Sequence, residues 1–276
     1  MKKNKNQNLM IELMNRYIKN TVEKQYQIDL NTATKKEIDN IKEINVSDLT
    51  MDKDASIWDF SDFHNLVKLD CSYLPITELI TKNCPNLEYL RWEGVRGAKI
   101  NIDITKNCKL KKVRGGQDGI RELDFSNNIL LEEIDISLSH YLRWLDISSC
   151  SNLKRITLFG VLIPFVDLTG LHNLEYVNIS YLNQYRNMAD VYGNGYPRPI
   201  IFVDEDFDEN IIDPQTHMYS YYTYKLIRVA ECSRESSFLY VLKNMKDEIL
   251  SILSDSRGSA IAEFHYRLLE IYDNIE

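Results

Sequence analysis

The chain has 276 residues, of which 44% are hydrophobic, so it can form one large domain, or one domain with a small appendage. Its formal net charge of −8 at pH 7 argues against sequence-independent nucleic-acid binding, which needs clustered lysine and arginine. No apolar run is long enough to cross a bilayer, and charged residues interrupt the segment 9–20, unlike a secretory leader. We therefore expect a cytoplasmic protein that binds neither nucleic acid nor membrane, with export by a route lacking such a leader as the open alternative.

Residues 1–43 predict an N-terminal helical cap. Apolar residues between positions 9 and 22 follow helical spacing. A second helix is expected to begin after Thr34, because Glu37 follows three residues later in the pattern of a capping box. The next segment, residues 43–47, has the alternation of a first strand.

A first repeated string of the form Leu-x-x-Leu-x-apolar runs through residues 44–181. Its members begin at Leu66, Leu87, Leu110, Leu131, Leu153 and Leu174. The starting positions differ by 21, 23, 21, 22 and 21 residues. This near-constant step is typical of a repeat protein.

A second string, apolar-Asp-apolar-Ser/Thr, recurs about half a period away from the first. Its aspartates are Asp59, Asp103, Asp124, Asp146 and Asp167. One member is missing between Asp59 and Asp103, and Ile80 fits the vacant aspartate position. We expect these aspartates to cap nearby backbone groups rather than to line up as an ion-binding ladder.

The two strings together predict a solenoid of about six coils of about 21 residues, each with two short extended stretches joined by turns. Alternation places the second apolar residue of each first string inside, and stacking should bury these residues in one column. The column would contain Leu69, Leu90, Val113, Ile134, Ile156 and Val177.

The cysteines predict small buried side chains rather than a metal site. Thr81-Lys-Asn-Cys84 and Thr105-Lys-Asn-Cys108 share four letters, and Ser148-Ser-Cys150 has a similar place, so we expect all three cysteines at stacked corners. No Cys or His set has zinc spacing, so we expect no metal and no other cofactor.

These strings resemble leucine-rich repeats, in particular the short bacterial class that includes internalin-type and cysteine-containing repeats. The closest match is the segment 66–71, Leu-Val-Lys-Leu-Asp-Cys, and the resemblance covers residues 44–181. It implies an α/β, right-handed, curved solenoid used for protein recognition. The pair Gly115-Gly116 departs from the pattern, and because we find no wall anchor or secretion signal, the surface location of internalins is not carried over.

After the repeat, residues 182–215 predict a loop, one more strand at Ile200–Val203 and an acidic linker. The acidic stretch 204–210 does not fit a calcium-binding loop, because glutamate and glutamine stand where that loop needs glycine and glutamate. Residues 216–276 predict a C-terminal helical cap or small bundle, with a separate effector or docking module as the alternative. Its helices are expected at 216–232, 236–253 and 259–274.

We expect no enzyme activity from the solenoid. The five histidines are scattered, and no phosphate-binding glycine loop occurs. Cys232, close to the expected end of a helix, is the residue on which a catalytic alternative for the C-terminal region would depend.

The outward positions of the first strings form the candidate binding surface, because tyrosine and arginine often anchor interfaces. Arg91, Lys111, Lys112 and Arg114 are expected to form one basic patch beside Tyr89. The full set of candidate partner-binding residues is Tyr89, Arg91, Lys111, Lys112, Arg114, Lys154, Arg155 and Tyr176.

The sequence therefore predicts a non-catalytic bacterial scaffold, expected to be a monomer, that binds a partner protein through an outward face of the solenoid. Two alternatives stay open. The solenoid could select the substrate for an enzymatic or effector module in the C-terminal helices, or the chain could be an inhibitor or immunity-type protein that blocks an enzyme.

Overall fold

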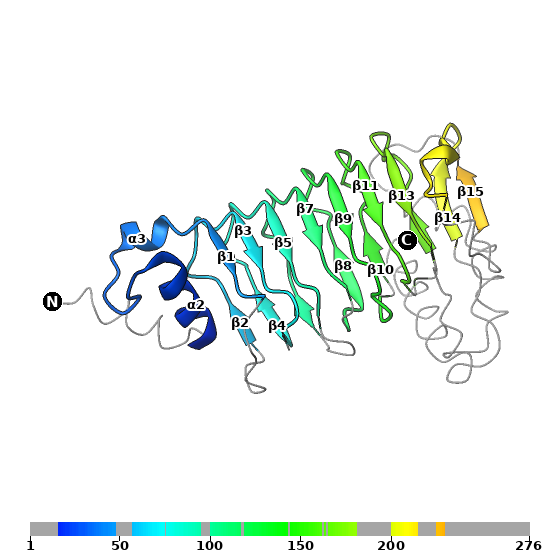
Figure 1. Ribbon diagram of the computed structural model, residues 1–276. Coiled ribbons are helices and arrows are strands. Elements are labelled where there is room, and N and C mark those ends of the chain that lie inside the picture. Colours follow the sequence, from blue (N-terminus) through cyan, green and yellow to red (C-terminus); the bar gives the residue numbers. More distant parts are fainter. Residues whose placement is uncertain are drawn as a thin grey trace, which may run out of the picture.

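A computed structural model describes two α-helices, a row of stacked coils, two further strands and the short 3-10 helix η2 (Glu209–Ile211). The described residues are 16–47, 57–74, 76–94, 100–116, 119–142, 144–161, 163, 165–180, 200–214 and 225–229. Figure 1 shows the coils stacked in sequence order, with the α-helices beside the first strand. Among the described helices, none is both long and apolar enough to span a bilayer.

One side of the solenoid is a continuous parallel sheet in the order β1-β3-β5-β7-β9-β11-β13. Its strands are β1 (Glu43–Asn45), β3 (Lys68–Asp70), β5 (Tyr89–Arg91), β7 (Lys112–Arg114), β9 (Glu133–Asp135), β11 (Arg155–Thr157) and β13 (Tyr176–Asn178). The central residue of each strand faces inward and is at most 1% exposed. The register aligns Ile44 with the six residues of the predicted column, which is thereby confirmed.

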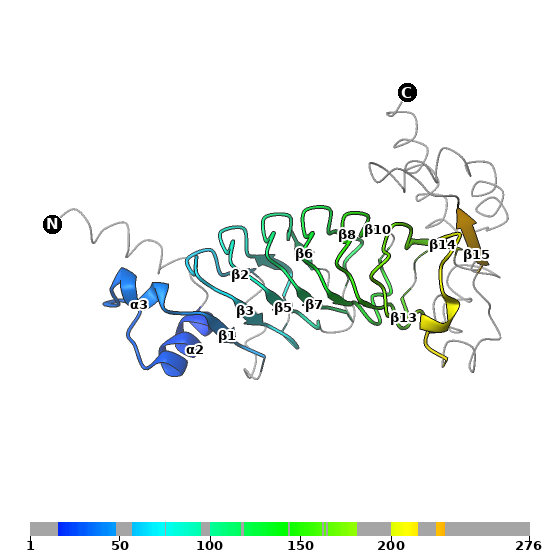
Figure 2. The ribbon, with the colours of Figure 1, turned by 90° about the horizontal axis from the view of Figure 1, so that it is seen from above.

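The other side carries the second string, as predicted, but in three shorter sheets (Figure 2). These contain β2 (Ile57–Asp59), β4 (Glu78–Ile80) and β6 (Asn101–Ile102); then β8 (Glu122–Asp124) and β10 (Trp144–Asp146); then β12 (Phe165–Asp167), β14 (Ile200–Asp204) and β15 (Lys225–Val229). Asp59 pairs with Ile80, which confirms that Ile80 occupies the missing aspartate position.

Each aspartate of the second string caps the corner that follows it. The Asp103 carboxylate accepts hydrogen bonds from the backbone N–H and hydroxyl of Thr105, at 3.0 and 2.6 Å. The same backbone bond recurs at the other second-string aspartates. Local capping of the aspartate column is therefore confirmed. The first string uses the same device, for example between Asp70 and Ser72.

The corners after β4, β6, β8 and β10 hold a buried ladder of polar side chains. Cys84 and Cys150 are buried there as predicted, and burial raises the pKa of each thiol to about 12. The prediction for Cys108 is wrong, because this residue is exposed and Asn107 takes the buried position. The strand register sets Thr81 beside Ile104, so the two Thr-Lys-Asn-Cys segments are offset by one residue.

The asparagines of this ladder bond the coil before their own. The Asn107 side-chain N–H group donates to the carbonyls of Thr81 and Cys84, both at 3.0 Å. Asn128 donates in the same way to Ile104 and Asn107, at 3.2 and 2.9 Å. Because each side chain ties its coil to the previous one, the ladder supports the constant stacking of the corners.

A close contact accounts for the glycine pair that interrupts the first string. Trp92 follows β5 and is fully buried, and Gly115 follows β7 at the equivalent position of the next coil. A Cβ atom on Gly115 would lie 2.3 Å from the Trp92 ring. Gly116 has φ +132°, and a Cβ there would meet the carbonyl of Ser137. The bulky indole therefore requires glycine beside it.

Two helices precede the first strand, α2 (Arg16–Tyr26) and α3 (Lys35–Asp39). The predicted capping box is present, since the side chains of Thr34 and Glu37 each bond the other residue's backbone N–H. Tyr26 bonds both the carbonyl and the N–H of Glu43, at 2.8 and 3.1 Å. The helix thereby pairs backbone groups at the free edge of β1. The predicted helical residues before Arg16 lie outside the described residues.

At the C-terminal end, the strand predicted at Ile200–Val203 is confirmed as part of β14. The helix predicted over 216–232 is wrong at Lys225–Val229, which pairs in parallel with β14 along five residues. This run of aliphatic and basic residues suits either element, and the open edge of β14 favours the strand. The helices predicted at 236–253 and 259–274 lie outside the described residues, as does Cys232.

Candidate functional site

The outer face of the seven-stranded sheet, called here the sheet face, places two outward side chains on every strand. The first outer column contains Glu43, Lys68, Tyr89, Lys112, Glu133, Arg155 and Tyr176. The second outer column contains Asn45, Asp70, Arg91, Arg114, Asp135, Thr157 and Asn178. The structure therefore puts six of the eight predicted binding residues on these columns, and Lys111 and Lys154 immediately before β7 and β11.

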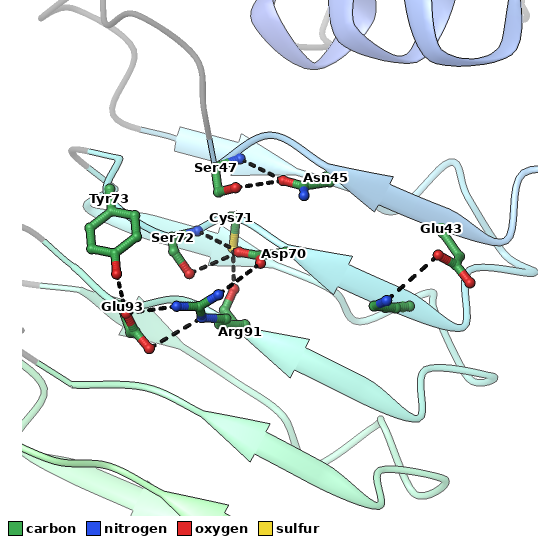
Figure 3. A network of polar contacts seen from close by, with 10 residues as sticks. Glu43, Asn45, Ser47, Asp70, Cys71, Ser72, Tyr73, Arg91 and Glu93 are labelled. Atoms are coloured by element: carbon green, nitrogen blue, oxygen red, sulfur yellow. Dashed lines mark hydrogen bonds and ion pairs between the residues drawn. The ribbon is translucent and has the colours of Figure 1, made fainter.

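Arg91 is held by carboxylates on two sides (Figure 3). Its guanidinium donates two hydrogen bonds to Glu93, at 3.1 and 3.0 Å, and one to Asp70 at 3.3 Å. The Tyr73 hydroxyl donates to the same Glu93 carboxylate at 2.7 Å. Partial burial opposes ionisation of Glu93, but the bonds from Arg91 and Tyr73 hold its pKa below the ordinary range. Arg91 is thus a fixed bridge between coils.

The lysines beside the columns form ion pairs with the preceding coil. Lys111 contacts Glu88 at 2.8 Å, and Lys154 contacts Glu132 at 3.0 Å. The predicted basic patch of Arg91, Lys111, Lys112 and Arg114 thus has carboxylates one strand spacing away beside its cations. Such exposed pairs contribute little to stability but order the side chains that they join.

Three predicted binding residues gather around the carboxylate of Glu133. Lys112 contacts it at 2.8 Å and Arg114 at 3.8 Å. Arg155 stands opposite Glu133 on the other side, in register on β11. The hydrogen bond from Lys112, and the charges of Lys112, Arg114 and Arg155, hold the pKa of Glu133 below its ordinary value despite partial burial. The carboxylate therefore lies at the centre of a small cluster of cations and is less exposed than Lys112 and Arg114.

Tyr176 lies at the end of the same column and is fixed from three directions. The Arg155 guanidinium sits over its ring, 4.2 Å from the centroid. Its hydroxyl donates to the Asp213 carboxylate, and the Asn178 amide bonds both groups. The sequence could not indicate Asp213, which is 37 residues away along the chain. Glu93 was also missed, because it follows β5 outside the repeated outward positions.

A hollow of about 510 Å³ lies on the opposite side of the solenoid, where β6 and β8 do not pair. It is lined by Thr77, Ile100, Asn101, Ile102 and residues 119–122. Its charged lining residues are Arg121 and Glu122, and none of these lining residues is a histidine or cysteine. Among the described residues, no group of three potential ligands could hold a metal ion.

The stacked parallel strands and the repeated leucines define a solenoid of the leucine-rich-repeat type. The chain is similar to solved internalins from Listeria monocytogenes. The functional domain of InlJ, which includes a cysteine ladder, is 17% identical over 63% of this chain and 42% of that chain, with a TM-score of 0.39. An internalin InlF is 16% identical over 62% of this chain and 58% of that one, with a TM-score of 0.41.

A third similar structure, internalin C2 from the same organism, is 13% identical over 78% of this chain and 93% of that chain, with a TM-score of 0.46. The chain spans less than two thirds of the InlJ and InlF chains. No family model and no curated protein matches the sequence.

Proposed function

We propose that the chain is a non-catalytic scaffold that binds a partner protein on the sheet face. The observation that carries the proposal is the order of this face, where ion pairs and a ring contact hold the predicted binding side chains in place. Arg91 is fixed by two carboxylates, and Arg155 is fixed against Tyr176. Side chains ordered in advance lose less conformational entropy when a partner binds.

The sheet face also suits a partner better than the opposite side does. Its seven strands form one uninterrupted surface, whereas the second-string strands are divided among three sheets. Outward side chains at the ends of the second-string strands, such as Asp103 and Asp146, are occupied in capping their own corners. Capping residues such as Asp70 and Asp135 occur on the sheet face as well. This face also offers tyrosine, arginine and lysine, including the residue types that most often anchor interfaces.

Site-specific photo-crosslinking tests the proposal. A photoreactive amino acid replaces Tyr89 in the full chain, which is then irradiated in an extract of its source organism. We expect one discrete protein adduct, because a bound partner would cover this position.

The matched controls carry the same photoreactive group at Lys82, exposed on the turn after β4, and at Asn101 on the opposite side. A binding role for the sheet face requires that the adduct be absent or much weaker at both controls. Equal adducts at all three positions, or adducts at the controls alone, would contradict it.

A further inference from the structure

The cluster around Glu133 combines one partly buried carboxylate with three cations from two strands. β9 contributes Glu133, and β7 and β11 lie on either side of it. Lys112 and Arg155 flank Glu133 in register, and Arg114 reaches the same carboxylate from the second outer column. The Glu133 side chain is 22% exposed, whereas those of Lys112 and Arg114 are 54% and 45% exposed. The cations therefore form the accessible rim.

The charges in this cluster do not cancel. Glu133 supplies one negative charge, and Asp135, in register beside Arg114, supplies a second. One oxygen of Asp135 already accepts the backbone N–H and hydroxyl of Ser137. Three cations against two carboxylates leave a surplus of one positive charge. The acids nearest to this surplus are already paired: Glu93, which also senses the charge of Arg114, is 25% exposed and bonded to Arg91, and Glu88 and Glu132 have their own lysines.

Aromatic rings stand at both ends of the cluster. The first outer column runs Tyr89, Lys112, Glu133, Arg155 and Tyr176 in consecutive strands. Four strand spacings of about 4.8 Å put the two tyrosines about 19 Å apart. An extended peptide of about six residues spans that distance. The column is thus a positive centre between two rings that can contact apolar side chains.

We propose that the partner presents an acidic peptide segment to this column, with carboxylates against Lys112, Arg114 and Arg155 and apolar residues toward Tyr89 and Tyr176. This inference rests on the proposed function and adds the chemistry of the partner. The chain as a whole is acidic, with a net charge of −8, so recognition depends on the local cluster and not on long-range attraction. Covering the cluster removes water and strengthens each cation–carboxylate contact.

Selection from a random displayed-peptide library on the full chain tests the inference, because it lets the surface choose its own ligand. We expect the enriched peptides to contain aspartate or glutamate and to bind more weakly as salt is added. Their affinities, measured by fluorescence anisotropy, should fall about tenfold or more with Arg114→Glu or Lys112→Glu. Lys82→Glu is the matched control, since it makes the same charge change on a turn, and it should leave the affinity unchanged.

The outcomes separate the two proposals. If the enriched peptides lose affinity with Tyr89→Ala but contain no excess of acidic residues, the sheet face binds peptides and the acidic-partner inference is overturned. If no enriched peptide responds to changes at Tyr89, Lys112 or Arg114, both proposals fail. A circular-dichroism melt of each variant shows whether a loss of binding reflects unfolding.

Discussion

At the scale of single residues, the contact between Trp92 and Gly115 shows how little free space the stacked coils leave. The indole of one coil fills the volume that a side chain would occupy in the next. Interiors packed this tightly respond to the addition of even one methyl group. The glycine is therefore part of the core, although it adds no side chain to it.

We predict that Gly115→Ala lowers the free energy of unfolding by about 1–3 kcal/mol, because the added methyl group overlaps the Trp92 ring. Urea denaturation measures the change. In a Trp92→Phe background the smaller ring leaves room for the methyl group, so Gly115→Ala should lower the free energy of unfolding clearly less. Equal costs in the two backgrounds would show that the indole does not explain the glycine.

The sequence indicated which residues point outward but not which of them would pair. The alternation placed Arg91, Lys112 and Arg155 on the surface correctly, because strand geometry decides that from local order alone. The partners of Arg91 and Tyr176 depend on contacts that the repeat does not encode. Glu93 lies beyond the strand, and Asp213 comes from a segment that follows the sequence repeat.

At the scale of one structural element, the buried corner ladder joins coils through side-chain donors of two kinds. Cys84 donates to the carbonyl of Phe60 in the preceding coil, and Asn107 and Asn128 donate to two carbonyls each. The matching letters around Cys84 and Cys108 suggested equivalent places, but the register shifts one of them by a residue. The spacing of the second string carries the same shift, because Cys84 and Cys150 follow Ile80 and Asp146 by four residues, whereas Cys108 follows Asp103 by five.

Asn128 offers a test of the ladder. Asn128→Ala should lower the free energy of unfolding by about 2 kcal/mol, because two buried carbonyls each lose one of their two donors and keep only a backbone N–H. Asn128→Cys should cost about half as much, because Cys150 shows that a thiol fits the next corner. Thermal or urea unfolding compares the two, with Asn152→Ala, which removes only a solvent-exposed bond to the Ile129 carbonyl, as the control for burial. If the cysteine variant is no more stable than the alanine variant, cysteine and asparagine do not act as equivalent donors in the ladder.

The helix α2 makes a second prediction at this scale. Tyr26→Phe removes both hydrogen bonds to the backbone of Glu43, so the free energy of unfolding should fall by about 1 kcal/mol. The Glu43 amide should also exchange its hydrogen with solvent faster, as measured by NMR. Tyr141→Phe, at an exposed turn, is the control. Unchanged exchange at Glu43 would mean that α2 does not protect the strand edge.

At the scale of the whole molecule, the repeat was predictable because each coil buries equivalent apolar residues against its neighbours. The spacing of the leucines and aspartates determined the coil length, the strands and the buried column. The strand β15 was not predictable in the same way. Its residues form a strand because β14 presents an unpaired edge, and that edge is a property of the assembled fold.

The capped corner at Asp103 and the Glu133 cluster predict acid sensitivity of the fold. Hydrogen bonds from Thr105 lower the pKa of Asp103, and Lys112 lowers that of Glu133. As pH falls, these two carboxylates therefore bind protons in the unfolded chain before they do so in the folded one. The stability that they contribute is present above the ordinary carboxylate pKa and is lost as pH falls through the lowered values. Urea unfolding across this acidic range should show the loss.

Thr105→Val keeps the backbone donor to Asp103 but removes the hydroxyl donor, so it should make the stability depend less on pH. Thr157→Val, on the outer face of β11, is the control. If the free energy of unfolding falls with pH in the same way in the variant and in the unaltered chain, the corner hydroxyl does not set the pKa of Asp103.

Both ends of the seven-stranded sheet are closed by polar contacts. At one end, Gln25 and Tyr26 bond the backbone of β1. At the other, the Asp213 N–H donates to the carbonyl of Val177 at 2.8 Å. Exposed strand edges can recruit further chains. Molecules of this protein are thereby discouraged from joining end to end into fibres, and a copy cleaved between the solenoid and Asp213 would lose that protection on one side.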